Sequence, residues 1–553
     1  MFILFLVVSL ISSINATSIV SRSQSYPLSQ PAAHGPTTQL TISNKVISPD
    51  GFHRSAIVVN GESPGHLITG QKGDMFNIEV VNQLSEKSML LLTGVHWHGI
   101  DQYKTNYYDG ASGITQCPIT PNHSFTYSFS AQNQAGTFWY HSHHSVQYCD
   151  GLRGPLIIYD PEDPSAHMYD VDDASTVITL TDWYHPVAHK LLHTIPAANS
   201  TLINGLGRYA GGPQSDLAVI NVTRGKRYRF RLIQMSCEAN IKFSIDGHNL
   251  TIIEADGELT EPLVVDQLQI LAGQRYSVVL EANQSVDNYW IRGIPNINQT
   301  YNGSAILRYH GAPKAEPTTL DTPSTKPLKE TDLRALNSSG YGNPDYNIAL
   351  EVSFKNITNK FHFYVNETEF KAPENPVLSQ ILEGTDPSQL HPKGSVHVLE
   401  ANKVVELTMI MIDAPGGPHP MHLHGHPFDV VQSAGNSTFN YVNPVRRDVV
   451  GVGCENGAGA ECKDNEKQVV IRWVTDNSGP WSLHWYDINS IKLSRTVLTL
   501  NNSHIDFHID EGFAVVMAES PKDTRAHVSP VPKEWGRLCP IYEEYKRTHP
   551  DEI

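Results

Sequence analysis

Residues 135–161 read AGTFWYHSHHSVQYCDGLRGPLIIYDP. Within this stretch, His141 and His143 are separated by a single residue. In a strand, residues two apart point to the same face, so the pair presents two imidazoles side by side. Because histidine is the commonest metal-binding side chain, the stretch predicts a strand that faces a metal ion or a metal cluster.

The same His-x-His spacing occurs again on both sides of this stretch. His96 and His98 flank Trp97, His422 and His424 flank Leu423, and a disturbed fourth copy surrounds His484. One such pair could arise by chance or mark a surface feature, but three pairs argue against both. Imidazole suits zinc, copper, iron and nickel, and the spacing alone does not choose among these metals.

Short segments with period-two alternation of apolar residues recur along the whole chain, and helical periodicity is scarce. Clusters of Gly, Pro and Asn separate these segments, which is typical of β-sandwiches and β-barrels. The segments are Gln39–Ile42, Phe76–Val81, Ser124–Phe129, Tyr228–Leu232, Leu268–Leu271, Tyr276–Leu280 and Val404–Ile410.

The length of 553 residues corresponds to three or four domains at about 150 residues per domain. Two linker-like stretches, Tyr159–Ser175 and Gly311–Asp332, divide the chain near residues 160 and 320. We therefore expect an all-β protein with domains at 17–160, 161–320 and 321–553.

The first residues, MFILFLVVSLISSINATS, predict a secretory signal peptide over residues 1–16. The apolar run is too short for a membrane span, and no later segment has 18 apolar residues, so we expect no membrane anchor. A formal net charge of −17 argues against nucleic-acid binding, which requires clustered Lys and Arg.

Sequons for N-linked glycans agree with secretion into the extracellular space, where six cysteines favour disulfides. Past the signal peptide, the sequons include Asn122, Asn199, Asn221, Asn249, Asn283, Asn298, Asn302, Asn337, Asn356, Asn366 and Asn436.

Five longer stretches of the sequence resemble the motifs of a known protein family. HWHGIDQYKTNYYDGASGITQCPI and the stretch at 135–161 resemble the first two copper motifs of the multicopper oxidases, and HPMHLHGHPFDVV resembles the third. TDNSGPWSLH and HIDFHIDEGFAVVMAE resemble the two halves of the fourth. The fungal laccases of basidiomycete type are the most similar family, over about Thr38 to Tyr542. The resemblance implies three cupredoxin-like Greek-key β-barrels in series.

The resemblance implies four copper ions, and the family's copper ligands can be matched to residues of this sequence one by one. His96 and His422 resemble the ligands of type 2 copper, and His419 and His508 resemble the ligands of type 1 copper. Phe513 lies where many blue-copper proteins have an axial Met, and a non-coordinating residue there favours Cu(I) and raises the potential. The other interpretation of Phe513 is plain core packing, and the two are compatible. The implied ligands of the type 3 pair are His98, His141, His143, His424, His484 and His504.

The fourth motif departs from the family pattern, which is His-Cys-His with the Cys as type 1 ligand and electron path. Residues 483–508 read LHWYDINSIKLSRTVLTLNNSHIDFH, so Trp485 follows His484 and Ser503 precedes His504. No cysteine stands there, and an indole offers only an N–H donor.

A retained intron explains this interruption. Trp485 is encoded by TGG and Tyr486 by TAT or TAC, which creates a donor-like GT. Asn502 and Ser503 can supply an acceptor-like YAG. The removed piece would hold one nucleotide of the Trp485 codon, seventeen codons from Tyr486 to Asn502 and two nucleotides of the Ser503 codon, 54 in all and in frame. The join creates a cysteine codon. The alternative is a genuine insertion in an inactive homologue.

The resemblance also implies disulfides Cys117–Cys539 and Cys149–Cys237, whereas Cys454 and Cys462 could form a local bridge or two free thiols. Glu238 resembles an acid that accepts a hydrogen bond from phenol or aniline substrates, although a solvated loop acid remains the alternative.

Three further residues match family positions around the substrate and the coppers. Asn296 and Ile297 match a second substrate-pocket segment. Asp109 matches an acid that could relay protons near the three-copper cluster, and its alternative role is to cap a turn.

The implied function is that of a secreted laccase, which oxidises phenolic or aromatic substrates by one electron and reduces O₂ to water. We expect a monomer. A ferroxidase-type multicopper oxidase is the alternative enzyme. The sequence as it stands, without the type 1 cysteine, would imply an inactive copper-binding homologue.

Overall fold

The computed structural model describes residues 34–192, 198–237, 240–295, 302–358, 360–412, 418–453, 467–485 and 512–552. Several sequence predictions fall outside these ranges. They are the signal peptide, Glu238, Asn296, Ile297, Cys454, Cys462, the segment 486–502, His504 and His508.

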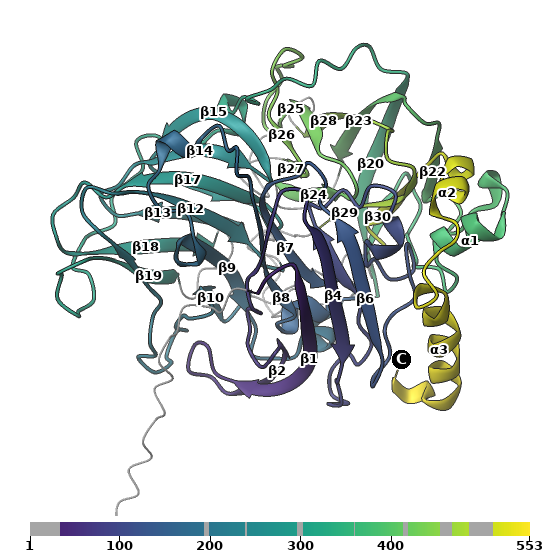
Figure 1. The fold of residues 1–553 in the computed structure, drawn as a ribbon, viewed down its shortest axis with the longest axis horizontal. Helices are drawn as coiled ribbons and strands as arrows, with labels where there is room; N and C mark the ends of the chain where they lie inside the picture. The colour runs from purple at the N-terminus through teal and green to yellow at the C-terminus, as the bar shows by residue number, and fades with distance from the viewer. Residues whose placement is uncertain are drawn as a thin grey trace, which may run out of the picture.

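The first domain consists of two four-stranded sheets, ordered β2-β1-β4-β6 and β3-β8-β7-β5. In Figure 1 it occupies the lower centre, in purple and blue. Its strands are β1 (Thr37–Ile47), β2 (Arg54–Val59), β3 (Ile68–Gln71), β4 (Met75–Asn82), β5 (Val95–His98), β6 (Ser124–Ser130), β7 (Gly136–Ser142) and β8 (Arg153–Tyr159).

The second domain has a six-stranded sheet, β10-β9-β12-β17-β14-β15, and a five-stranded sheet, β11-β19-β18-β13-β16. Its strands are β9 (Val177–Trp183), β10 (Ser200–Ile203), β11 (Val219–Val222), β12 (Arg227–Gln234), β13 (Ile241–Ile245), β14 (Leu250–Ala255), β15 (Glu258–Val265), β16 (Leu268–Ile270), β17 (Arg275–Glu281), β18 (Asn288–Pro295) and β19 (Gly303–Tyr309).

The third domain repeats this plan with sheets β21-β20-β23-β28-β25-β26 and β22-β30-β29-β24-β27. Its strands are β20 (Tyr346–Ile357), β21 (Lys360–Val365), β22 (Val396–Leu399), β23 (Val404–Met411), β24 (His419–Leu423), β25 (Phe428–Gln432), β26 (Arg446–Arg447), β27 (Val449–Val452), β28 (Gln468–Val474), β29 (Gly479–Trp485) and β30 (Ala514–Glu519). The α-helices of this part are α1 (Val377–Glu383), α2 (Pro521–Val528) and α3 (Trp535–Thr548).

Each sheet contains one parallel pair among antiparallel neighbours, and the pairs correspond across the three domains. β1 lies parallel to β4, β9 to β12 and β20 to β23. In the second sheets, β3 pairs with β8, β11 with β19 and β22 with β30. The architecture is therefore three cupredoxin-like β-barrels in series. Residue 160 directly follows β8, and residue 320 lies between β19 and β20, so no described strand crosses a predicted boundary.

The strands that carry these histidines differ in burial from strands that have one face toward solvent. β4 and β23 alternate between buried and more exposed residues, as expected for strands with one face toward a core. β5, β7 and β24 are buried at every position. One face of these strands packs in a barrel, and the other lies against a neighbouring domain.

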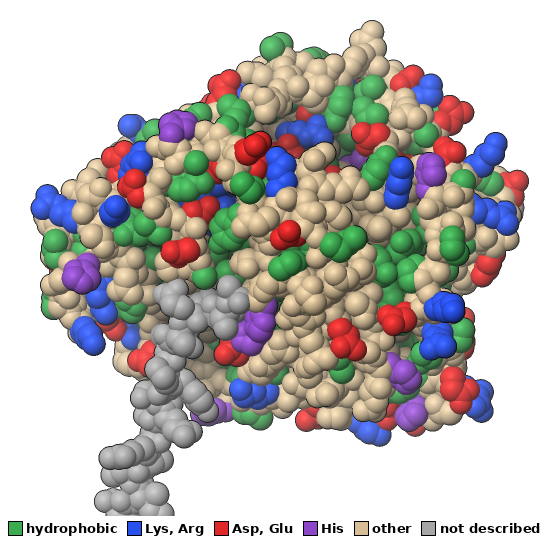
Figure 2. All heavy atoms as spheres, viewed as in Figure 1, with side chains coloured by type: hydrophobic (Ala, Val, Ile, Leu, Met, Phe, Trp, Pro, Cys, Tyr) green, Lys and Arg blue, Asp and Glu red, His purple; other side chains and the backbone are tan. Residues whose placement is uncertain are grey.

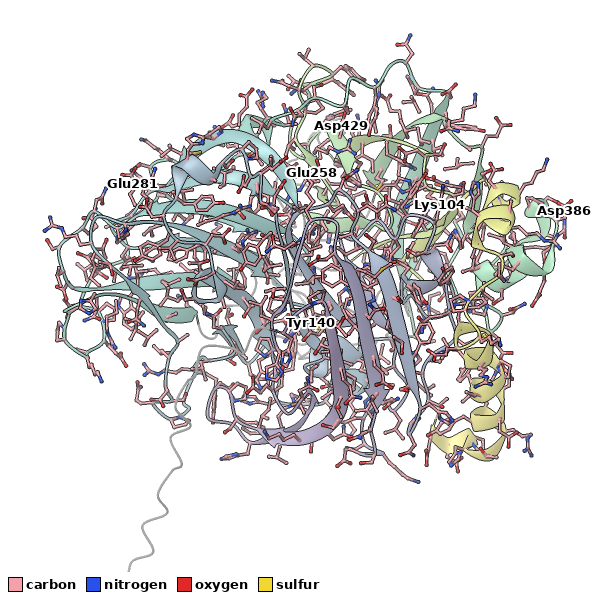
Figure 3. The ribbon with its side chains drawn as sticks, viewed as in Figure 1. Lys104, Tyr140, Glu258, Glu281, Asp386 and Asp429 are labelled. Atoms are coloured by element: carbon pink, nitrogen blue, oxygen red, sulfur yellow. A yellow bond between two sulfur atoms is a disulfide. The ribbon has the colours of Figure 1, made fainter. Side chains whose placement is uncertain are left out.

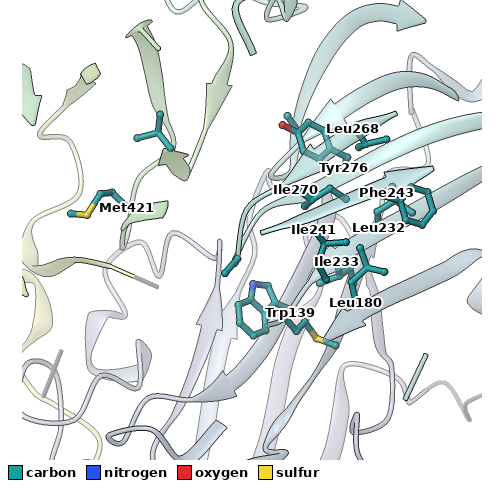
Figure 4. Close-up of a cluster of buried hydrophobic side chains, with 14 of the residues drawn as sticks. Trp139, Leu180, Leu232, Ile233, Ile241, Phe243, Leu268, Ile270, Tyr276 and Met421 are labelled. Atoms are coloured by element: carbon teal, nitrogen blue, oxygen red, sulfur yellow. The ribbon is translucent and has the colours of Figure 1, made fainter. Parts of the chain in front are cut away.

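One hydrophobic core runs through the contact between the domains. It includes Trp139 of the first domain, Leu232 and Ile241 of the second, and Met421 of the third, each at most 3% exposed. Figure 4 shows Trp139, Leu232 and Ile241 grouped together, with Met421 apart from them beside strands of the third domain. Because this core is shared, the strands that carry the histidines are held in a fixed relative position.

The structure contains disulfides Cys117–Cys539 and Cys149–Cys237. The first attaches α3 to the first domain, and the second joins the first domain to the second. Trp535 of α3 also donates its indole N–H to the Thr115 carbonyl at 3.0 Å. The C-terminal helix is thus anchored on the first barrel, along the right side of Figure 1.

Candidate metal centre

Two pairs of antiparallel strands bring the predicted histidines together from opposite ends of the chain. In the first domain, β5 pairs with β7 so that His96 lies opposite His141. In the third domain, β24 pairs with β29 so that His422 lies opposite His484. Each pair places imidazoles on neighbouring strands, and the two pairs face each other across the boundary between the domains.

The imidazoles form two close groups of three, each with ring nitrogens within 4.8 Å of one another. One group contains His96, His98 and His422, and the other contains His143, His424 and His484. In the second group, His484 Nε2 lies 3.2 Å from His143 Nε2 and 2.9 Å from His424 Nε2. Three nitrogens that point at one spot are suited to bind a cation there.

One stacked pair of rings joins the two groups, and a second stacked pair lies within the first group. The His96 ring lies 3.9 Å from that of His424, and the His98 ring lies 3.8 Å from that of His422. The remaining histidine of the second motif, His141, lies with its ring 5.4 Å from the ring of His96. Seven of the eight histidines predicted for a three-metal cluster therefore converge, and the eighth, His504, lies outside the described residues.

Hydrogen bonds at Nδ1 fix the tautomer of several of these rings. His96 Nδ1 donates to the Asp109 carbonyl oxygen at 2.8 Å, and His422 Nδ1 donates to the Asp448 carbonyl oxygen at 2.8 Å. His141 Nδ1 donates to the Ser142 carbonyl oxygen at 2.8 Å. In a neutral imidazole the other nitrogen, Nε2, then carries the lone pair that binds a metal.

Burial lowers the pKa of several of these imidazoles. It lowers the pKa of His143 to about 3, with the neighbouring His96 as the second cause. Burial likewise holds the pKa of His424 and His484 well below the ordinary value of 6.5. Only a neutral imidazole can bind a metal, so the site is already in its ligand form at neutral pH.

Asp109 lies directly against this cluster and is fully buried. Its carboxylate accepts from His424 Nδ1 at 2.9 and 3.1 Å, and one oxygen lies 3.2 Å from His96 Nδ1. The side chain therefore orients a ring of the third domain, while its backbone carbonyl orients a ring of the first. This placement suits both the predicted proton relay and a positioning role.

His419 and Phe513 are the described residues from the predicted type 1 site, and both are buried. Phe513 packs its ring 5.7 Å from the ring of Phe363. Asn240 donates its side-chain N–H to the carbonyl of Pro418, the neighbour of His419, at 2.9 Å. This contact fixes the segment just after Glu238 beside the segment that carries His419.

Sequence reasoning missed Asp448. Its carboxylate lies 3.4 Å from His98 Nε2 and 3.6 Å from His422 Nδ1. Asp448 is 26 positions from His422, so no local spacing connects them. Only the pairing of β24 with β27, which starts at the next residue, brings them together.

Three family models match the chain, one for each domain. All three describe multicopper oxidases, and they match residues 41–163, 174–312 and 369–485. Fold and histidine arrangement thus agree with one class of protein, the multicopper oxidases.

The chain is similar to laccases over nearly its whole length. It is 51% identical to Laccase-5 of Trametes villosa, over 92% of this chain and 94% of that relative. It is 52% identical to the laccase of Pycnoporus cinnabarinus, over 93% and 95%. The chain belongs to the multicopper oxidases and, within that family, to the fungal laccases.

Solved structures agree with this assignment. The laccase of Botrytis aclada is 31% identical, with a TM-score of 0.76 over 94% of this chain and 93% of that one. Fet3p, described as a multicopper oxidase that functions in iron import, is 26% identical, with a TM-score of 0.77 over 93% and 95%. The higher identity to laccases favours phenol oxidation over the ferroxidase alternative.

The surface and the helices relate to three further predictions, which concern nucleic-acid binding, a membrane anchor and N-linked glycans. Figure 2 shows acidic and basic side chains interspersed on the face viewed. Among the described helices, none is both long and apolar enough to cross a membrane. Ten of the eleven sequons named above lie in the described part of the chain, and their asparagines are exposed or half-buried.

Proposed function

We propose that the converging imidazoles are the copper ligands of this laccase, with His96 and His422 at type 2 copper. The proposed type 3 ligands are His98, His141, His143, His424, His484 and His504. The observation that carries this assignment is the set of buried rings whose Nδ1–H groups are already bonded to oxygen.

The donor set fits copper. Imidazole is a preferred ligand of copper, and carboxylates stand behind the rings rather than among the converging nitrogens. His96 Nε2 is buried and has no hydrogen-bond partner among the described residues, as expected for a ligand atom. Bound copper ions supply one-electron redox chemistry, so four one-electron oxidations of substrate provide the electrons that reduce one O₂ to two waters.

The protein handles the protons of this reaction through carboxylates. Oxidation of a phenol to a phenoxyl radical releases one proton, and we assign Glu238 as its acceptor. The Asn240–Pro418 hydrogen bond supports this, because it ties the residues after Glu238 to the His419 segment. Reduction of O₂ consumes four protons, and Asp109, buried against His424, is suited to deliver them. Asn296 and Ile297 complete the proposed substrate pocket.

The type 1 half of the proposal uses His419, His508 and a cysteine, with Phe513 in the axial position. The cysteine requires that Tyr486–Asn502 be a retained intron. The third family match ends at residue 485, directly before this segment. In addition, β29 and β30 pair with His484 opposite Ala514, and the segment falls between these strands in the sequence, so its removal takes no residue from that pairing. Sequencing of the transcript tests this, and a main form that keeps the segment would refute it.

The function is tested by the stoichiometry of turnover. A copper-loaded preparation with an intact fourth motif should consume one O₂ for every four phenols oxidised, without accumulating hydrogen peroxide. Fe(II) turnover on the same preparation should be much slower than phenol turnover. Faster Fe(II) turnover would favour the ferroxidase alternative, and a preparation that binds copper without turnover would favour the inactive homologue.

We also propose that the protein is secreted. The signal-like residues 1–16 and the accessible sequons support an extracellular, N-glycosylated monomer. Treatment with an endoglycosidase should increase the mobility of the secreted protein on a denaturing gel, and an unchanged mobility would contradict the glycan prediction.

A further inference from the structure

The second domain contributes none of the proposed copper ligands, yet one of its side chains extends to the metal centre. Arg275 begins β17 and is fully buried. Its Nη1 and Nη2 donate to Oδ1 and Oδ2 of Asp448, each at 2.6 Å. Such a bidentate, charge-assisted pair fixes the orientation of a carboxylate more tightly than a single hydrogen bond does.

All five N–H groups of this guanidinium have acceptors. Besides the two bonds to Asp448, Nε donates to the Thr137 carbonyl at 3.0 Å, Nη1 to the Gly273 carbonyl at 3.1 Å and Nη2 to the Asp256 carbonyl at 3.1 Å. These acceptors come from the first, second and third domains. Arg275 is therefore a fixed point where the three domains meet, and it has no donor left for a movable partner.

A second contact holds the same segment of the third domain. Asp256 accepts from Arg447 Nε at 2.8 Å and from the Val449 backbone N–H at 3.2 Å. Together, Asp256 and Arg275 fix three consecutive residues, 447–449. Next to them, Arg446 lies 3.3 Å from Glu258 and 3.7 Å from Asp429, and Figure 3 shows these two acids at the junction of the second and third domains.

Residues 447–449, which are held by Arg275 and Asp256, include Asp448, and Asp448 contacts two of the proposed ligands. The Asp448 carbonyl accepts the Nδ1–H of His422, and the Asp448 carboxylate lies 3.4 Å from His98 Nε2. A shift of Asp448 would therefore change the orientation of two rings that stack on each other. Groups behind metal ligands commonly change metal affinity or activity by about 10- to 100-fold when they are removed.

We propose that Arg275 is a positioning residue of the three-copper centre, which acts through Asp448 on His98 and His422. The second domain would then set the geometry of a site to which it donates no ligand. This inference rests on the proposed function, because it takes His98 and His422 as copper ligands.

The competing explanation is that Arg275 and Asp448 form an ordinary buried ion pair, which joins two domains and has no effect on the metal centre. The chain offers a matched control in Arg231, which is 1% exposed and lies on β12 of the same sheet. Its Nε and Nη2 donate to the two carboxylate oxygens of Asp172, each at 2.7 Å, and its Nη1 donates to Thr137 Oγ1 at 3.0 Å. Arg231 thus forms a bidentate buried pair, but it contacts no proposed ligand.

The experiment compares Arg275→Gln, Arg275→Lys and Arg231→Gln in the form of the chain that lacks the proposed intron and therefore has an intact fourth motif. The readouts are the affinity for type 2 copper, the type 2 electron paramagnetic resonance spectrum, the KM for O₂ and the KM for a phenol. Arg275→Gln should bind type 2 copper about 10- to 100-fold more weakly, with an altered spectrum and a raised KM for O₂, but an unchanged KM for phenol. Arg275→Lys should recover part of the loss, because Lys keeps the charge but not the bidentate geometry.

Arg231→Gln should lower the unfolding temperature while leaving the type 2 spectrum of the wild type. If Arg275→Gln fails to fold, Asp448→Asn should give the same spectral change. The proposal is overturned if the Arg275 or Asp448 variants keep the wild-type copper affinity and spectrum, or if Arg231→Gln reproduces their loss. A wild type with no type 2 signal at all would instead refute the proposed ligand assignment.

Discussion

At the scale of single residues, two variants of Asp109 distinguish its two possible roles, which are to deliver protons and to position the His424 ring. Asp109→Asn keeps an oxygen that can accept from His424 Nδ1 but cannot carry a proton, whereas Asp109→Ala removes both functions. If Asp109 delivers protons, both variants should lose about 10²-fold or more in kcat, while the Asn variant keeps four coppers. Copper content and kcat, measured together, check this. An Asn variant with wild-type kcat would leave Asp109 with only a positioning role.

Glu238 carries a prediction about substrate protons. Glu238→Ala should slow the oxidation of a phenol by about 10²-fold, because the phenol loses its proton acceptor. Oxidation of a donor that releases no proton should change far less. The ratio of kcat/KM for the two substrates measures the effect, and equal losses for both would argue that Glu238 is structural.

The lowered pKa values of the histidines predict how acid affects the copper-free protein. The pKa of His143 is about 3 in the folded chain, against 6.5 for an ordinary His, so the unfolded chain takes up the proton first as the pH falls. Stability is therefore lost progressively below about pH 6.5. The unfolding temperature of the copper-free protein, measured from pH 7 to pH 4, should fall, and His143→Gln should reduce the slope. An identical slope in the variant would contradict the assignment.

At the scale of elements, the attachment of α3 to the first domain is a stabilising feature. Cys539 bonds to Cys117, and Leu538 is buried in the first-domain core. Cys539→Ser should cost about 2–5 kcal/mol of unfolding free energy, because it frees a long loop in the unfolded chain. Denaturant unfolding measures the loss. Arg547→Ala, which removes an exposed ion pair to Glu544 on the same helix, is the control and should cost far less, because exposed ion pairs contribute little to stability.

The strands also explain why one part of the site could be predicted from the sequence and another part could not. His96 and His98 share a strand, so their spacing alone indicated a common face. Asp448 and Arg275 carry no such signal, because they are 173 positions apart in the sequence and meet only through tertiary packing. The histidines were therefore predictable as local pairs. The carboxylates and guanidinium behind them follow only from the packing of three domains.

At the scale of the whole molecule, the alternating strands and two linkers predicted an all-β chain of three domains. The order of strands within the sheets did not follow from those patterns, because pairings such as β1 with β4 depend on tertiary contacts. The C-terminal helix α3 was missed as well, since its sequence contains Pro540 and reads as a polar tail. Resemblance to a family supplied the Greek-key topology that periodicity could not.

We expect this chain to be a working laccase only when its fourth copper motif is continuous. Without the cysteine, type 1 copper loses its thiolate, and Trp485 offers no replacement. The nineteen residues between His484 and His504 also remove any reason for these two imidazoles to share a strand face.

The most direct test measures phenol oxidation by matched, copper-loaded preparations of the 553-residue chain and of the form that lacks the proposed intron. The shorter form should be blue and turn over phenol with O₂, whereas the 553-residue chain should show no blue band and almost no turnover. Comparable turnover by the 553-residue chain would contradict the account, because it would show that the segment is tolerated and that electrons reach the cluster without the cysteine.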